Sequence, residues 1–126
     1  MRGLGADELI DYTTTPDFSS VAGDLDIVFE TVGAYAGQAV AALRPGGTLV
    51  ATLAQSLPPV AEPAARRGVR TAALLVESDR LGLTELVRLV EDGLLTPTVA
   101  ATYPLAQAGA AQSTRSGPGK TVLTVD

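Results

Sequence analysis

Two apolar runs joined by a short helical segment constrain the fold of this chain more than any other feature. The first run, Leu25–Phe29, ends in three consecutive apolar residues, which is typical of a strand buried inside a parallel sheet. A helix is expected over Ala34–Leu43, because helix-forming residues dominate it. The residues Arg44-Pro45-Gly46-Gly47 should end that helix, and Thr48–Leu53 should form the next strand. The pattern predicts a compact β–α–β unit with a right-handed crossover.

The rest of the chain continues the alternation of strands and helices, which indicates an α/β fold. A helix is expected after a cap at Ser78 or Asp79, ending at Gly93. Its apolar residues follow the i, i+3, i+4, i+7 spacing of one helix face: Leu83, Leu86, Val87 and Val90. Further strands are expected at Glu8–Tyr12, Val69–Val76, Thr98–Thr102 and Thr121–Val125, short helices at Asp17–Ala22, Ala61–Arg67 and after Pro104, and a turn at residues 113–119.

Composition excludes several classes of function. The 126 residues include no Cys and no His, so thiolate chemistry, disulfides, imidazole bases and ordinary zinc sites are not expected. A net charge of −5 gives no basic footprint for nucleic acid. No apolar run is long enough to span a membrane and no export signal opens the chain. We therefore expect a cytoplasmic protein that binds neither nucleic acid nor membranes.

Several segments, in their order along the chain, are similar to one superfamily. They read LGADELIDY at residues 4–12, DIVFETVG at 26–33 and LRPGGTLV at 43–50, and GKTV follows at 119–122. This ordered set resembles the C-terminal cofactor domain of medium-chain dehydrogenases/reductases, in particular the quinone oxidoreductase-like members with a zinc-binding dehydrogenase-type domain. The resemblance covers nearly the whole chain.

The resemblance implies an architecture. Residues 1–126 would form a single α/β domain, the C-terminal part of an NAD(P)-binding Rossmann domain. It would be a partial Rossmann-like, mostly parallel sheet flanked by helices, lacking the first βαβ unit and its glycine-rich phosphate turn. The catalytic domain of the family would lie upstream of Met1. The strands at Leu9–Tyr12 and Thr121–Val125 would then lack their usual partners, and direct pairing, strand exchange and a partner chain all remain open.

The resemblance also implies a partial cofactor surface and no catalytic or metal-binding residue. Tyr12 matches a tyrosine beside the adenosine 2′-phosphate of NADPH-using relatives, although a half-buried tyrosine at a strand end is an equal alternative. The other candidates match a turn under the nicotinamide ribose, a loop at the carboxyl end of a strand, and a segment beside the carboxamide. For the turn, an equal alternative is that Gly33 simply ends a strand, and core packing explains the segment beside the carboxamide equally well. These candidates are, in that order, Thr31, Val32 and Gly33; Thr52, Leu53 and Ala54; and Leu74, Leu75 and Val76.

Three other positions bear on the candidate site. Glu30 is the one carboxylate considered for the site, and capping a helix or facing water is its alternative role. Gly117 stands where some relatives have Asn, so that contact is lost. Lys120, the only lysine, is expected to be a surface charge.

The function expected from the resemblance is that of a cofactor-domain fragment of an NAD(P)H-dependent quinone oxidoreductase-like reductase, inactive alone. NADP(H) binding would be weak or absent, no zinc would bind, and the choice between NAD and NADP stays open. A homo-oligomer, most simply a dimer through Val69–Val76, is expected, and a partner chain could carry the missing N-terminal half. The alternatives are a non-enzymatic oligomerising or ligand-binding module and a class I methyltransferase fragment, since LRPGG also precedes a late strand in those enzymes.

Overall fold

The computed structural model describes residues 2–114 and 117–125 of the chain. The chain divides into two compact units, Met1–Glu77 and Ser78–Asp126, and each is described here by itself. The expectation of one domain over residues 1–126 stays a prediction. The two end residues of that domain lie outside the described residues, as do residues 115 and 116 of the expected turn at 113–119.

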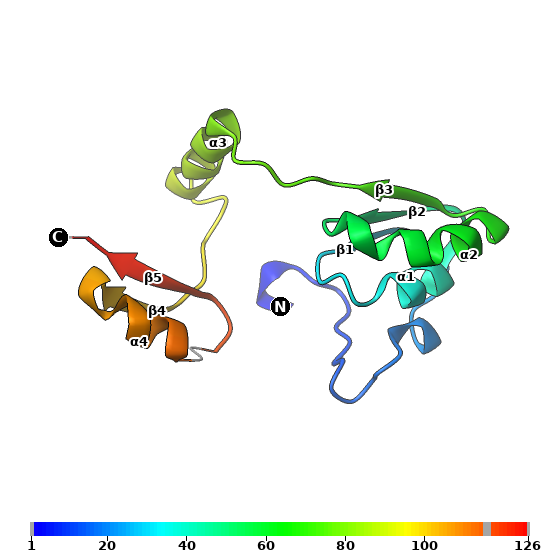
Figure 1. Cartoon of the computed structure of the whole chain (residues 1–126), viewed down its shortest axis with the longest axis horizontal. Helices are drawn as coiled ribbons and strands as arrows, with labels where there is room; N and C mark the ends of the chain where they lie inside the picture. The colour runs from blue at the N-terminus through cyan, green and yellow to red at the C-terminus, as the bar shows by residue number, and fades with distance from the viewer. Residues whose placement is uncertain (1, 115–116, 126) are drawn as a thin grey trace. The chain divides into compact units, whose positions relative to one another are not determined.

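The first unit contains a three-stranded parallel sheet in the order β1-β2-β3 (Figure 1). A helix follows each of the first two strands, so the predicted β–α–β unit is confirmed and a second one adjoins it. The elements are β1 (Leu25–Glu30), α1 (Ala36–Ala42), β2 (Leu43–Ala51), α2 (Ala61–Arg66) and β3 (Arg70–Ala73). Single turns of 3₁₀ helix lie between them and before them: η1 (Arg2–Leu4), η2 (Phe18–Ser20), η3 (Ala54–Ser56) and η4 (Pro58–Val60).

The strand β2 begins at Leu43, directly after α1. This is five residues before Thr48, where the sequence predicts the strand to begin. The helix ends at Ala42 and the chain is already extended at Leu43. Gly46 has a φ of +81°, a left-handed conformation that glycine adopts at little cost. A Cβ on Gly47 would lie 2.9 Å from the Arg44 carbonyl oxygen and 3.1 Å from that of Leu25. The two glycines thus allow the chain to leave α1 and approach β1 closely.

The core of the first unit lies between one face of this sheet and the two helices. Ala39 and Val40 of α1, Leu49 of β2 and Ala64 of α2 are almost fully buried there. Small and medium side chains fill this layer, as the scarcity of large aromatic residues requires. Burying one leucine such as Leu49 stabilises the fold by about 1.5 to 3 kcal/mol.

The opposite face of the sheet is not covered by elements of the first unit. Paired residues of parallel strands point to the same face, and Val28 pairs with the buried Leu49. The neighbouring residues Ile27 and Phe29 therefore point the other way, where they are 67% and 57% exposed. The first unit therefore has two layers, one of strands and one of helices, and its helices cover only one face of the sheet.

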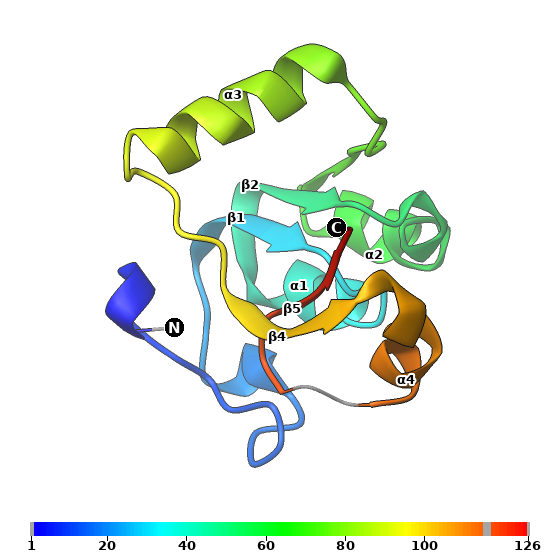
Figure 2. The same ribbon diagram turned by 90° about the vertical axis from the view of Figure 1, so that its left-hand side faces the viewer.

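The second unit pairs two parallel strands and contains one longer helix. β4 (Val99–Pro104) lies beside β5 (Lys120–Thr124), and η5 (Leu105–Gln107) and α4 (Ala108–Ser113) connect them (Figure 2). The resemblance implies that the strand at Thr121–Val125 lacks its usual partner strand. The expectation that it is unpaired is wrong. The strand pairs in parallel with β4, with one irregularity between Val99 and Ala101, because η5 and α4 bring the chain back alongside it.

The helix α3 (Arg80–Glu91) confirms the predicted cap, stop and apolar face. The carboxylate of Asp79 accepts hydrogen bonds from the backbone N–H groups of Leu81 and Gly82. At the other end, Gly93 has a φ of +71° and the Leu94 N–H donates to the Leu89 carbonyl. The apolar residues that were expected to share a face line one groove of the second unit: Leu83, Leu86, Val87 and Val90, with Glu91, Leu95 and Pro97.

The strand expected at Glu8–Tyr12 is not formed. Residues 8–11 are irregular and residues 12–14 form a turn. The carboxylate and the carbonyl of Asp11 accept bonds from the next residues, which turns the chain at Tyr12. No strand among the described residues pairs with residues 8–11, so the apolar Leu9 and Ile10 have no ladder to join.

Two other boundaries differ from the sequence prediction. The strand expected over Val69–Val76 ends at Ala73, because β2 ends at Ala51 and offers no partner beyond it. The short helix expected over Asp17–Ala22 is a single 3₁₀ turn, and the Asp17 side chain caps it by accepting from the Ser19 N–H. In the part of the chain that the structure describes, no helix has the length and apolar character needed to span a membrane.

Candidate functional site

The carboxyl ends of the three parallel strands lie along one edge of the first unit. Backbone hydrogen bonds link the residues at this edge: the Thr52 N–H donates to the Glu30 carbonyl at 3.0 Å, and the Leu74 N–H donates to the Ala51 carbonyl at 2.9 Å. The segments 31–33, 52–54 and 74–76 therefore leave the sheet from the same edge. Open α/β sheets bind their ligands at this edge.

The turn after β1 is held by the carboxylate of Glu30. This residue is only 5% exposed. Its Oε1 accepts hydrogen bonds from the backbone N–H groups of Val32 and Gly33, each at 2.8 Å, and its Oε2 accepts from Gly33 at 2.8 Å. Glu30 therefore neither caps a neighbouring helix nor faces water. It fixes the conformation of its own turn.

The same turn lies against the end of β2 through Gly33 and Leu53. Gly33 has a φ of +84°. A Cβ built on it would lie 2.5 Å from Leu53 Cδ1, so the Leu53 side chain occupies the space that any larger residue would need. The structure thus brings together two of the segments that the sequence assigned to the cofactor surface.

Asp11 positions Tyr12 beside this turn. The Asp11 carboxylate accepts from the Thr13 N–H at 2.9 Å and from the Thr13 hydroxyl at 2.6 Å. These bonds hold the pKa of the Asp11 carboxyl below its usual range, the hydroxyl being the larger cause. The Asp11 carbonyl also accepts from the Thr15 N–H at 2.8 Å. Tyr12 therefore projects from a hydrogen-bonded turn rather than from a strand.

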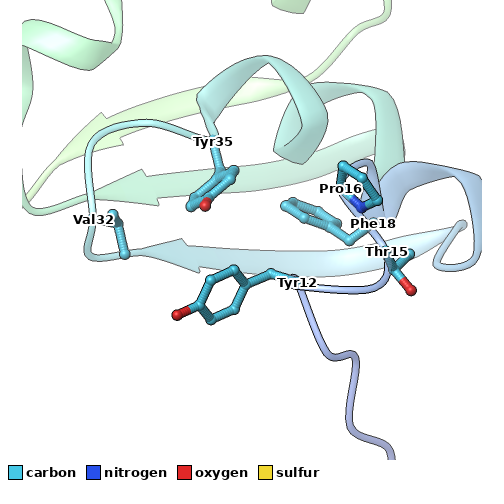
Figure 3. A pocket seen from close by; sticks show the side chains of 6 residues that line it. All are labelled: Tyr12, Thr15, Pro16, Phe18, Val32 and Tyr35. Atoms are coloured by element: carbon cyan, nitrogen blue, oxygen red, sulfur yellow. The ribbon is translucent and has the colours of Figure 1, made fainter.

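A cavity of about 290 Å³ lies between the Tyr12 turn and the turn after β1. In the view of Figure 3, Tyr12 lies on one side of it, Phe18 and Tyr35 lie on the other, and Val32 lies at one end. Three of the five aromatic residues of the chain border this space. The full lining is Tyr12, Thr15, Pro16, Phe18, Val32 and Tyr35. Flat aromatic walls of this kind favour a planar or apolar ligand group.

The far wall of the cavity is tied to α1. The side chain of Gln38 accepts from the Phe18 N–H at 3.1 Å and donates to the Pro16 carbonyl at 2.9 Å. The rings of Phe18 and Tyr35 meet edge to face with their centres 6.2 Å apart. The segment before β1 is thereby attached to the helix after it, and the cavity has walls from segments far apart in the sequence.

The structure thus unites some of the predicted site residues and separates others. Tyr12 and Val32 share the cavity, and Gly33 contacts Leu53. Thr31, Thr52 and Leu74 lie at the edge without lining the cavity, and Ala54 begins η3. Leu75 and Val76 lie beyond the end of β3 with their side chains about three-quarters exposed, so core packing, their alternative explanation, does not account for them.

The sequence does not predict the remaining cavity residues: Thr15, Pro16, Phe18, Tyr35 and the supporting Gln38. A usable signal was present in Phe18 and Tyr35, because aromatic residues are scarce in this chain and these two lie on either side of β1 and its turn in the sequence. The described residues hold no cluster of three acidic side chains able to bind a metal ion.

One family model matches almost the whole chain. Residues 4–123 match a family model described as zinc-binding dehydrogenase. Among curated proteins, none matches the chain. These results favour the reductase interpretation over the methyltransferase alternative.

Solved structures of oxidoreductases are similar to almost the whole chain. A quinone oxidoreductase from Coxiella burnetii has 25% identity and a TM-score of 0.80, and the match covers 99% of this chain and 41% of that one. An NAD-dependent alcohol dehydrogenase has 27% identity and a TM-score of 0.74, with 99% and 40% covered. The 2-octenoyl-CoA carboxylase reductase CinF from a Streptomyces species, solved with NADP and 2-octenoyl-CoA, has 29% identity and a TM-score of 0.59, with 79% and 24% covered. The chain therefore spans about two-fifths of the length of the first two relatives.

The zinc in the family description does not fit the residues present. The chain has no Cys and no His, the nitrogen and sulfur ligands that zinc prefers in proteins, and the described carboxylates form no cluster. No zinc-dependent step is therefore assigned to these residues.

The contact between Gly33 and Leu53 predicts that Gly33→Ala lowers the free energy of unfolding by about 1 to 2 kcal/mol. A positive φ is unfavourable for alanine and is the main cost, and the end of the partly exposed Leu53 side chain would have to move away from the new Cβ. Denaturant unfolding measures the change. Replacing Leu53 by Ala as well should recover only the part due to the clash. Gly37→Ala in α1 is the matched control, because nothing lies near its Cβ position and alanine favours a helix. A Gly33→Ala protein as stable as the Gly37→Ala protein would contradict the interpretation.

Proposed function

The chain belongs to the zinc-binding dehydrogenase family, and from this premise we propose that it is part of the cofactor domain of an NAD(P)H-dependent, quinone oxidoreductase-like reductase. The observation that carries the proposal is the edge where three parallel strands end, with an aromatic cavity beside it. The remaining length of such an enzyme would be supplied by further residues of the same protein or by a partner chain.

In this proposal the cavity receives the adenosine end of the cofactor. Tyr12, Phe18 and Tyr35 offer aromatic surface to a base, and Val32 offers apolar contact at the end nearest β1. The segments 31–33 and 52–54 would continue the surface along the sheet edge toward the nicotinamide end. The bound cofactor supplies a hydride in this family of reactions, and the role of these residues would be to bind and orient it.

The chain lacks a strong site for the cofactor's diphosphate. The sequence contains no glycine-rich phosphate turn after a first strand, which is where a helix N-terminus normally binds the anion. In the β1 turn, the N–H groups of Val32 and Gly33 already donate to Glu30. Affinity would therefore come from the base and sugar, and we propose that it is weak. The proposal does not choose between NAD and NADP, and binding measurements with both would decide.

A second proposal concerns self-association through β3. This strand lies at the edge of the sheet, and all four of its residues are exposed. The apolar residues that follow it, Leu74, Leu75 and Val76, are exposed as well. A bare edge strand that continues into exposed apolar residues favours pairing with another chain. The alternative function, a non-enzymatic oligomerising module, draws its support from the same edge.

The 126-residue chain alone is expected to have no reductase activity. It provides no imidazole or thiol for proton transfer and spans about two-fifths of the length of its solved relatives. Steady-state assays with NADPH or NADH and a panel of quinones and enones measure this. A turnover of about 1 s⁻¹ or more, the lower end of ordinary enzymes, would contradict the expectation.

Dinucleotide binding is expected to have a dissociation constant of roughly 1 mM, equivalent to about −4 kcal/mol. Titrations of the isotope-labelled chain with NADPH, NADH and 5′-AMP, followed by NMR, would measure it. Tyr12→Ala should weaken binding about tenfold, because stacking on one ring is worth about 1 to 3 kcal/mol. Tyr103→Ala in β4 is the control and should change nothing. Micromolar affinity, or equal effects of the two variants, would argue against the cavity as the site.

The chain is expected to form a homodimer that buries on the order of 1,600 Å² in total. Light scattering during size-exclusion chromatography would report a mass well above 12.8 kDa. The Leu74 N–H donates toward β2, so by alternation the Ala73 N–H points to the free edge. Ala73→Pro should therefore dissociate the dimer while the fold persists. Ala72→Pro, which removes a donor facing β2, should instead destabilise the unit. A folded monomer at high concentration would contradict the proposal.

A further inference from the structure

Glu30 is the one charged residue that is buried among the described residues of this chain. Burying a carboxylate is unfavourable unless charged or polar partners compensate it. None of the ion pairs among the described residues involves Glu30. Its compensation comes from the backbone N–H groups of Val32 and Gly33, through three contacts at 2.8 Å. Such charge-assisted bonds are about twice as strong as neutral ones.

These bonds determine which groups the turn can offer to a ligand. Two successive backbone N–H groups at a turn commonly form an anion-binding nest. Here both point toward the Glu30 carboxylate, so neither is free for a phosphate. The carboxylate also places a negative charge directly behind the turn. What remains exposed toward the cavity is the side chain of Val32.

We infer that Glu30 is a positioning residue that makes the 31–33 turn bind the uncharged base or sugar of a ligand and reject its phosphates. Acting through the two N–H groups, Glu30 locks the turn against Leu53 and presents Val32 to the cavity. The part of this inference that concerns a nucleotide rests on the proposed function. The part that concerns the N–H groups rests on the geometry alone.

The geometric part is tested on the whole chain without any ligand. NMR scalar couplings across hydrogen bonds should connect the amide nitrogens of Val32 and Gly33 to the side-chain carboxyl carbon of Glu30. Glu30→Gln should accelerate hydrogen exchange at these two amides by about tenfold or more. The neutral amide lacks the charge that strengthens both bonds, and its NH₂ group cannot replace the contact between Oε2 and the Gly33 N–H. Glu30→Asp, which keeps the carboxylate, should restore part of the protection. Glu62→Gln, on the exposed face of α2, is the matched control and should leave both amides unchanged.

The absence of these couplings in the unaltered protein, or equal exchange in Glu30→Gln and Glu62→Gln, would overturn the inference. Should Glu30→Gln fail to fold, the couplings in the unaltered protein still decide the question.

The ligand part is tested with inorganic phosphate, adenosine and 5′-AMP. Phosphate alone should leave the Val32 and Gly33 amide signals unmoved. Adenosine should shift the Val32 methyl and Tyr12 ring signals as strongly as 5′-AMP does. Phosphate-dependent shifts at the two amides would overturn the rejection of anions. If neither nucleoside nor nucleotide binds, the proposed function fails, while the couplings and the phosphate titration still decide the role of Glu30.

Discussion

The pairing of β2 with a parallel strand on each side holds the first unit together. Strands that run in parallel need a crossover between them, and here each crossover is a short helix that covers the same face of the sheet. Leu49 lies at the centre of that arrangement with no exposed surface. The close approach at Gly47 allows β2 to start directly at the end of α1. The cavity, the β1 turn and the bare edge strand all depend on the register that this pairing sets.

That register also places the ends of the strands together, which gives Glu30 its role. The Glu30 carbonyl accepts from Thr52 in the next segment, and its carboxylate accepts from its own turn. One residue thus connects two of the segments at the sheet edge, through its main chain and through its side chain. The 31–33 turn is therefore held in place without a ligand, and less conformational entropy remains to be lost in it on binding.

The sequence predicts the local features well because their causes are local. The α3 helix shows this, since its cap at Asp79 and its stop at Gly93 lie within a few residues of the bonds they form. The strand expected at Glu8–Tyr12 shows the opposite case. A strand exists only with a partner, and the Asp11 turn competes for the same backbone.

The candidate site was only partly predictable for a related reason. Tyr12 and Val32 could be named from the resemblance, but Phe18 and Tyr35 join them through contacts that no spacing encodes. Glu30 was recognised as a carboxylate at a strand end, and its partners could not be read from the sequence because they depend on the path of the turn. Leu75 and Val76 were assigned to a site segment, and the end of β3 leaves them exposed.

The two units differ in how much surface each removes from water. Among the described residues of the second unit, Ala111 is the only buried one. The sheet of this unit has two strands, whereas that of the first unit has three. Proteins open locally where buried apolar contacts are few, so thermal fluctuations should expose the second unit far more often than the core around Leu49. In a cell, proteases act on such transiently open segments. The lifetime of the protein would then depend on how rarely the second unit unfolds locally. It would depend less on the stability of the first unit, whose core supports the candidate site.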